Sequence, residues 1–247
     1  MYERGYERAA ADDSCRINSV LQRMKHEGVK TKRLHEGYYL RPLSSVSLTS
    51  PARFAEEVPI MSATRFIEPV VRFCAVITRH DAARHWAIAR LANQWGHTTI
   101  CSAEIPFEAG GYYTPSMGTG LQKSLIAVAG FTDPGGLADW KNETNQWEQE
   151  YTSSSQHEEE RPLNLDPGYM TQAKLVLATT KDRDHRLYLR DGMFAEVTLT
   201  YVGKVWQHHR WTYPSYRTAE VAKFANQCRS DLRQHLKETR QFRRHPQ

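Results

Sequence analysis

A histidine and a glutamate flank the clearest turn motif in the chain. Asp191-Gly192 stands between two runs that alternate apolar and polar residues, and this pattern is the strongest short-range signal of a β-hairpin. Counting outward from a two-residue turn places His185 diagonal to Glu196, with Thr198 on the same face. A carboxylate beside an imidazole can orient and charge the ring, so His185 and Glu196 form a candidate acid/base pair. The structural alternative is a cross-strand hydrogen bond on a solvated sheet face.

Charged residues near this hairpin could bind an anion. Lys174 and Lys181 are seven residues apart, so they share one face if the segment is helical. With Arg186 they could bind a phosphate or carboxylate through charge-assisted hydrogen bonds. The hairpin register places Arg186 opposite Val197 on a mostly apolar face, where it could reach water or pair with Asp166. The alternative is a solvated charged helix. The candidate ligand-binding residues are Asn164, Asp166, Lys174, Lys181, Arg186, Thr198, Tyr112 and Tyr113.

Standard motifs for other chemistry are missing. HExxH, GxSxG and GxGxxG do not occur. A hard metal could have four ligands near the hairpin: Asp182, Asp184, His185 and Glu196. Their spacing matches no standard metal motif, so no metal ligand is predicted, and no cofactor is specified. Lys123-Ser124 follows two glycines, but a glutamine replaces the last glycine of a phosphate-binding loop, and a strand is expected next.

The elements that position these residues begin with a β-α-β-β-α pattern. Apolar runs of strand length, helical stripes and capping residues support this interpretation. The predicted elements are a strand at Val71–Thr78, a helix at Asp81–Trp95, strands at Thr98–Phe107 and Lys123–Phe131, and a helix from Asp133 with Leu137, Trp140, Thr144 and Trp147 on its inner face.

The second half of the domain contains the hairpin. Its predicted elements are a turn at Asp166-Pro167-Gly168, a helix at Tyr169–Ala178, the hairpin strands, a strand reaching His208, and a helix from Thr218 with Val221, Phe224, Cys228, Leu232 and Leu236 on one side. The predicted fold class is α+β. A ferredoxin-like β-α-β-β-α half joins an antiparallel hairpin and meander, and a C-terminal helix closes the domain.

Composition limits the partners that this chain is expected to have. Its 247 residues are 40% hydrophobic, which suffices for one ordinary core. The net charge of +5 is weaker than that of a dedicated nucleic-acid binder. Four scattered cysteines without a CxxC motif are typical of reduced thiols and predict a cytoplasmic location. No run of 18 apolar residues occurs, so no membrane partner is expected.

The first part of the chain differs from the rest. Residues 1–68 are rich in Lys and Arg and poor in large apolar residues, which predicts a basic, disordered extension. Compact-looking sequence follows Met61, which could be the true start of the protein. Residues 69–240 are predicted to form a single α+β domain.

Several segments resemble a known family. They are NLDPGYMTQAKLVLATTK, HRLYLRDGMFAEVTLTY, WTYPSY, YYTPSMG and the helix containing Lys141, Thr144 and Asn145. Together they resemble the bacterial and archaeal family called domain of unknown function 4416, over roughly Pro69 to Leu232. Two positions depart from it: Ser215 stands where the resemblance implies an acidic residue, and Arg190 where a glycine is common. The family implies no established activity.

These observations favour one function and leave two others open. The favoured one is a domain that binds a small anionic or phosphorylated metabolite or nucleotide, with its status as an enzyme undecided. An RNA- or ribosome-associated protein would use a basic C-terminal helix, which carries Arg229, Arg233, Lys237, Arg240, Arg243 and Arg244. A protein-interaction module would use the aromatic loop from Trp211 to Tyr216. The sequence leaves the oligomeric state open.

Overall fold

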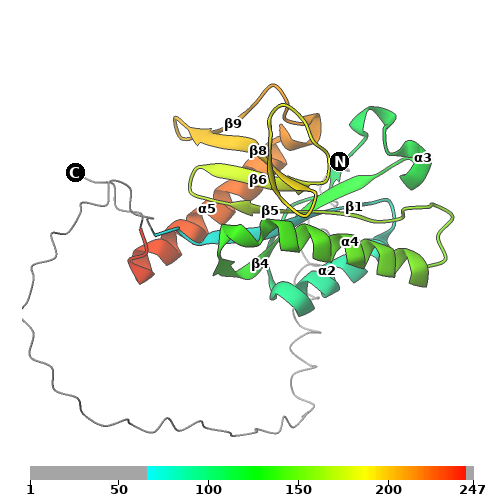
Figure 1. Ribbon diagram of the computed structural model, residues 1–247, viewed down its shortest axis with the longest axis horizontal. Coiled ribbons are helices and arrows are strands. Elements are labelled where there is room, and N and C mark those ends of the chain that lie inside the picture. Colours follow the sequence, from blue (N-terminus) through cyan, green and yellow to red (C-terminus); the bar gives the residue numbers. More distant parts are fainter. Residues whose placement is uncertain (1–65, 243–247) are drawn as a thin grey trace, which may run out of the picture. The chain divides into compact units, whose positions relative to one another are not determined.

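The structure, a computed structural model, describes residues 66–242 (Figure 1). The predicted extension, apart from its last residues, and Met61 lie outside this range. The helices are α2 (Asp81–Trp95), α3 (Thr114–Met117), α4 (Leu137–Ser154) and α5 (Ala219–Thr239). The strands are β1 (Val70–Thr78), β2 (Thr98–Cys101), β3 (Ile105–Pro106), β4 (Gln122–Thr132), β5 (Asn164–Met170), β6 (Lys174–Thr179), β7 (Arg186–Arg190), β8 (Met193–Val202) and β9 (Val205–His208).

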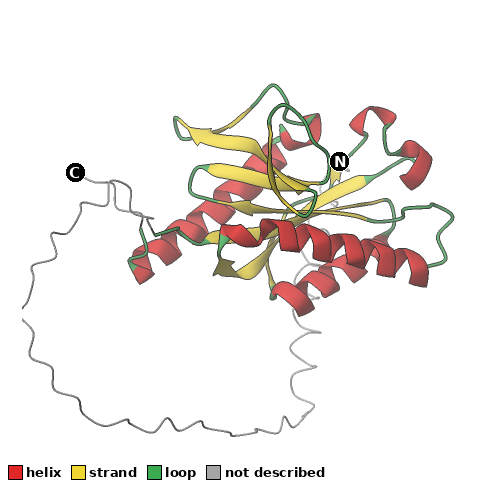
Figure 2. Cartoon of the chain, viewed as in Figure 1, coloured by secondary structure: helices red, strands yellow, loops and turns green. Residues whose placement is uncertain are grey.

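The described strands form one antiparallel sheet between layers of helix (Figure 2). The strand order is β2-β4-β1-β5-β6-β8-β7, with β3 beside β4 and β9 beside β8. Helices α2 and α4 pack on one face, and α5 packs on the other. Strand β1 is apolar along nearly its whole length because both of its faces are covered. The predicted mixture of helices, an antiparallel sheet and a C-terminal helix is therefore confirmed.

Helix α5 shows how the sequence pattern determines an element. Its cap is Thr218, whose side-chain oxygen accepts a hydrogen bond from the backbone N–H of Val221 at 3.3 Å. The predicted apolar stripe is buried against the sheet, and Phe224 meets Phe73 edge-on at 5.7 Å between ring centroids. The predicted helix at Asp81–Trp95 and the strand at Val71–Thr78 are confirmed as well.

Two predicted elements are wrong. The segment Thr98–Phe107 is split into the short strands β2 and β3. The predicted helix at Tyr169–Ala178 is instead part of the β5–β6 hairpin, which turns at residues 171–173. There the hydroxyl of Thr171 accepts hydrogen bonds from the backbone N–H groups of Ala173 and Lys174. The apolar run of β6 lies between two helical layers, and burial on both faces favours a strand.

The predicted turn at Asp166-Pro167-Gly168 is also wrong, because these residues lie within β5. Gly168 serves close packing rather than a turn. A Cβ at this position would lie 2.4 Å from the carbonyl oxygen of Val176 and 2.7 Å from the Phe73 ring. Only glycine lets β5 approach β6 and the Phe73 ring this closely.

Candidate functional site

The candidate site lies where two neighbouring strands separate. Strand β5 pairs with β6 only from Gly168 to Met170, although β5 begins at Asn164. Beyond these pairs the strands diverge, and a pocket of about 120 Å³ is lined by residues from both. Its charged side chains are those of Lys141, Arg161, Asp166, Lys181, Arg186 and Glu196. Its aromatic side chains are those of Phe107, Tyr113, Tyr213 and Tyr216.

Helix α4 replaces the missing strand partner. The N–H of Leu165 donates to the Glu148 carboxylate at 2.7 Å, and its carbonyl accepts from the Lys141 ammonium at 2.7 Å. Lys141 and Glu148 are seven residues apart, so they project from one face of α4. Both side chains are buried, and a buried charge requires partners of this kind. The two side chains therefore complete the hydrogen bonding of β5 where β6 has separated from it.

Asp166 is held as a carboxylate inside this network. Its oxygens lie 3.2 Å from the Lys141 nitrogen and 2.9 Å from the Asn164 amide nitrogen. Burial acts to raise the pKa of Asp166, but the Lys141 charge, the hydrogen bonds and Arg161 outweigh it and hold the pKa below its ordinary value. The predicted residues Asn164 and Asp166 thus lie together and line the pocket.

Arg161 fixes the loop before β5. Its guanidinium donates to Glu148 Oε2 from Nη2 at 2.6 Å and from Nε at 3.1 Å, and it also bonds Asn164 Oδ1. The sequence interpretation assigned Arg161, Lys141 and Glu148 no role. One signal was present: Lys141 belongs to a segment that carries the family resemblance.

The hairpin prediction is confirmed at the turn, but its register is wrong beyond it. Asp191 and Gly192 have φ angles of 53° and 74°, as expected of an Asp-Gly hairpin turn. A bulge at Leu189 then shifts the pairing, so that Arg186 faces Glu196 rather than Val197. The bulge therefore places the arginine and the glutamate side by side.

Arg186 and Glu196 form a buried ion pair. Arg186 Nε donates to Glu196 Oε2 at 2.9 Å, and Nη1 donates to the Lys181 carbonyl at 2.8 Å. The two side chains are 6% and 3% exposed. The predicted residue Thr198 donates to the other Glu196 oxygen at 3.2 Å. Nη2 of Arg186 takes no part in these bonds.

The predicted neighbours His185 and Glu196 are hydrogen bonded. His185 Nε2 lies 3.1 Å from Glu196 Oε2, and Nδ1 lies 2.9 Å from an Asp184 oxygen. The imidazole stacks on Trp211 at 5.0 Å between centroids. Glu196 lines the pocket, whereas His185 is not one of the lining residues. The geometry supports the pairing, and the acid/base role remains a prediction.

Two of the alternative metal ligands near the hairpin, Asp184 and Glu196, are joined by His185 and also bond other side chains. Asp184 accepts from Arg210 at 2.9 Å as well as from His185. Glu196 is occupied by Arg186 and Thr198.

Lys181 and the predicted residue Tyr113 line the pocket, whereas the predicted residue Tyr112 is exposed and does not. The Lys181 ammonium is 4.0 Å from the Tyr112 ring centroid and 5.5 Å from that of Tyr113. The hydrogen bond and the charge of Lys181 lower the pKa of Tyr112, which is exposed. Burial raises the pKa of Tyr113, so its hydroxyl stays protonated.

Lys174 does not belong to the site. It begins β6 opposite Thr200 and does not line the pocket. The shared face predicted for Lys174 and Lys181 assumed a helix. Along an extended chain, seven residues separate them by roughly 23 Å.

Lys123 and Tyr216 are further groups that sequence reasoning missed. The Lys123 ammonium donates to the Ser215 carbonyl at 2.8 Å and its hydroxyl at 2.9 Å, and lies 3.4 Å from the Tyr216 ring centroid. Burial lowers the pKa of Lys123 to about 7, against the opposing charge of Asp166. Tyr216 lines the pocket, and its buried hydroxyl has no hydrogen-bond partner among the described residues.

Comparison with known proteins gives one match. The model of a family described as a domain of unknown function, DUF4416, matches residues 68–232. No curated protein and no solved structure matches the chain. Within the described part of the chain, no helix combines the length and apolar character needed to span a membrane.

Proposed function

The chain belongs to the DUF4416 family, and we propose that the pocket between β5 and β6 binds a small anionic or phosphorylated metabolite or nucleotide. The observation that carries the proposal is the convergence of four cationic side chains and the buried, unpartnered Tyr216 hydroxyl on this pocket. A bound anion would accept hydrogen bonds from groups of both kinds.

The balance of charge favours an anion. The lining contains Lys141, Arg161, Lys181 and Arg186 against two carboxylates. Lys141 and Arg161 already hold carboxylates, so they position the site and add positive potential. Lys181 differs because its ammonium rests on tyrosine rings, so it is the cation best able to turn toward a ligand.

Tyr216 adds a directional donor. Burial raises its pKa well above the ordinary value, so the hydroxyl remains a proton donor at neutral pH. A buried hydroxyl without a partner costs about 1–3 kcal/mol. A phosphate or carboxylate oxygen would remove that cost, whereas an apolar ligand would not.

Lys181, which lines the pocket, and Lys174, which does not, provide a test of anion binding. Thermal unfolding of the full chain would be followed with inorganic phosphate, sugar phosphates and nucleotides, because a ligand that binds only the folded state raises Tm. We expect Lys181→Ala to weaken the stabilisation about tenfold or more in ligand concentration. Lys174→Ala, the matched control outside the pocket, should respond as the parent does.

Two results would refute the proposal. One is that none of these anions stabilises the full chain. The other is that Lys181→Ala and Lys174→Ala respond alike. Tyr216→Phe gives a second check, because it removes only the unpartnered hydroxyl and is expected to reduce binding without lowering the stability of the free protein.

Catalysis is a further step of the same proposal. His185 contacts Glu196, which lines the pocket, so the pair could relay a proton to a bound ligand. Once a ligand is identified, His185→Gln should preserve its binding and abolish turnover. If His185→Gln loses ligand binding and the parent shows no turnover, this histidine has only a positioning role.

We also infer that the first half of the domain is ferredoxin-like. The chain order β1, α2, β2, β4, α4, β5 and the spatial order β2-β4-β1-β5 support this, with α2 and α4 on one face.

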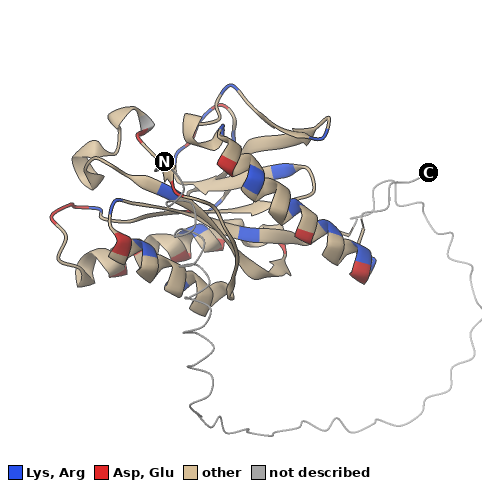
Figure 3. Ribbon diagram, turned by 180° about the vertical axis from the view of Figure 1, so that it is seen from behind, with Lys and Arg blue, Asp and Glu red and all other residues tan. Residues whose placement is uncertain are grey.

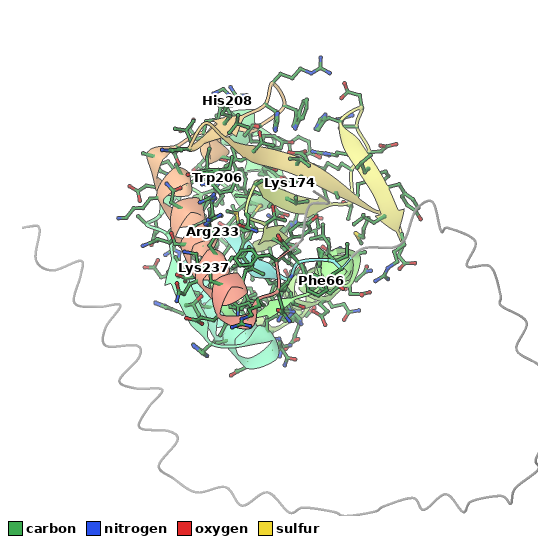
Figure 4. All side chains as sticks on the ribbon, turned by 90° about the vertical axis from the view of Figure 1, so that its left-hand side faces the viewer. Phe66, Lys174, Trp206, His208, Arg233 and Lys237 are labelled. Atoms are coloured by element: carbon green, nitrogen blue, oxygen red, sulfur yellow. The ribbon has the colours of Figure 1, made fainter. Side chains whose placement is uncertain are left out.

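The alternative function, RNA binding, is supported by the side of the molecule near α5. Figure 4 shows Arg233 and Lys237 on α5, and Trp206 donates a hydrogen bond to Asn226 of the same helix at 3.1 Å. Two α5 cations are already engaged, because Arg229 donates to the Gln172 carbonyl at 2.7 Å and Arg233 to its side chain at 2.9 Å. The pocket therefore remains the favoured site.

A further inference from the structure

A second polar cluster lies outside the pocket. His80 directly precedes α2, and His157 and Glu159 lie in the loop after α4. Each residue can offer one ligand atom, and the three atoms lie within 4.8 Å of one another. All three residues are partly buried, and His80 and Glu159 are hydrogen bonded to each other.

The geometry aligns two imidazoles with one carboxylate. The rings of His80 and His157 stack with centroids 3.9 Å apart and planes 26° apart. Glu159 Oε2 lies 3.0 Å from His80 Nε2, and Arg79 lies 3.1 Å from the other oxygen. A small shift would let a single ion replace the contact between His80 and Glu159, because metal–ligand distances for nitrogen and oxygen are about 2.0–2.2 Å.

Tyr151 orients one of the two histidines. Its hydroxyl lies 2.9 Å from His157 Nε2. Histidines that ligate a metal commonly hydrogen bond through their second ring nitrogen, which fixes the tautomer and the ring orientation. If His157 Nε2–H donates to the Tyr151 oxygen, Nδ1 is the nitrogen that would bind the ion.

We propose that His80, His157 and Glu159 bind a divalent transition-metal ion of the zinc class. Two imidazoles and one carboxylate favour such an ion over Ca²⁺ or Mg²⁺, which prefer oxygen ligands alone. Three protein ligands would leave a position for water. This inference is independent of the anion proposal.

The site would connect two segments that also line the pocket. His80 follows Ile77 by three residues, and Glu159 precedes Arg161 by two. The segments are already joined by a hydrogen bond from Thr78 to the Pro162 carbonyl at 2.7 Å. A bound ion would strengthen this connection and so stabilise the loop that carries Arg161.

The test uses untagged full-length protein stripped of metal. Zn²⁺ would be titrated in competition with a chromophoric chelator, and we expect one equivalent to bind tightly. His80→Gln and His157→Gln should each weaken binding about tenfold or more. His85→Gln is the matched control, because it removes an exposed histidine of α2, the helix that His80 precedes. Melting of each metal-free variant checks folding, and Tyr151→Phe provides a milder variant with the ring retained.

Co²⁺ supplies a spectroscopic readout. Its visible bands should be intense in the parent, as expected of a low-coordinate site with nitrogen ligands, and should weaken in His80→Gln and His157→Gln. The proposal is overturned if the parent binds no equivalent of Zn²⁺ more tightly than His80→Gln and His157→Gln do. It is equally overturned if His85→Gln loses as much affinity as they lose.

Discussion

Lys123 is a basic residue in a buried environment. Its side chain is fully buried, and its hydrogen-bond acceptors are both neutral oxygens of Ser215. Burying a charged group without an ion-pair partner disfavours the charged form. The pKa is about 7, against an ordinary value of 10.5. Folding therefore disfavours the charged form of Lys123, relative to the neutral form, by on the order of 5 kcal/mol.

The first prediction concerns pH and Lys123. Between pH 7 and pH 10.5 the unfolded chain binds more protons at this position than the folded chain, so stability rises with pH. Replacing Lys123 with Met removes this penalty, which is fully present below about pH 7. Urea unfolding should show Lys123→Met gaining stability relative to the parent near neutral pH, and the gain should shrink toward pH 10.5. A gain independent of pH would contradict this account.

The second prediction concerns the partner of Lys123. Ser215 stands where the family resemblance implies an acidic residue, and its hydroxyl already contacts the ammonium. Ser215→Asp should therefore raise the Lys123 pKa, because an adjacent carboxylate stabilises the charged form. NMR titration of the lysine side chain would measure the change. Ser215→Asn, which is similar in size and uncharged, is the control and should leave the pKa low.

At the scale of elements, strand β7 contains two arginines in opposite environments. Arg186 pairs with buried Glu196, whereas Arg190 pairs with the exposed residues Asp139 and Asp191. Removing one partner of a buried pair leaves an uncompensated charge and costs about 3–5 kcal/mol. An exposed pair is worth about 0–1 kcal/mol.

The third prediction compares these two arginines. Arg186→Gln should lower the free energy of unfolding by about 3–5 kcal/mol, and Arg190→Gln by less than about 1 kcal/mol. Denaturant unfolding measures both. Equal effects would show that the Leu189 bulge does not bury the first pair.

The fourth prediction concerns Gly168 in β5. A Cβ here would collide with the Val176 carbonyl, which belongs to backbone and cannot rotate away. Gly168→Ala should therefore separate β5 from β6 further and destabilise the protein by about 2 kcal/mol or more. Thermal unfolding would measure it, and an unchanged Tm would exclude close approach as the reason for this glycine.

The elements of the fold that could be predicted from the sequence are those determined by nearby residues. Strand β1, helix α5 and the Asp191-Gly192 turn were predictable because burial, capping and turn chemistry agree within a few residues. Segment 169–178 was not, because short apolar runs fit a buried strand and a helix alike. The Leu189 bulge could not be predicted, since it arises from pairing across strands, and it determines the partner of Arg186.

The candidate site was predictable only in part. Asn164, Asp166, Lys181, Arg186, Glu196 and Tyr113 do line one pocket. Lys141 and Glu148 resemble ordinary surface charges of an amphipathic helix until the separation of β5 from β6 is known. Their role depends on a tertiary feature that no local pattern contains.

At the scale of the whole molecule, the distribution of charged residues on α5 bears on nucleic-acid binding. Figure 3 shows Lys and Arg spaced along α5, mixed with Asp and Glu. Such mixing weakens a continuous phosphate-binding surface. Arg243 and Arg244, which were included in the predicted basic helix, lie outside the described residues.

The fifth prediction tests RNA binding by this surface. A phosphate-backbone binder loses affinity steeply as salt rises, and neutralising a contact reduces that slope. If α5 binds RNA, the combined Arg233→Gln and Lys237→Gln variant should reduce the slope while leaving anion binding in the pocket intact. Filter binding at several salt concentrations would measure this. No RNA binding at low salt would remove the alternative.

The separation of β5 from β6 also affects how the two parts of the sheet are connected. Only three residue pairs join these two strands. On one side of this junction the sheet contains β5, β1, β4 and β2, and on the other side it contains β6, β8 and β7. Between β5 and β6 the two parts of the sheet are therefore hydrogen bonded only along a short seam, although their side chains pack in shared hydrophobic clusters. A molecule bound in the pocket would contact side chains from both parts, so it would hold them together. We expect ligand binding to register first as slower amide hydrogen exchange along that seam.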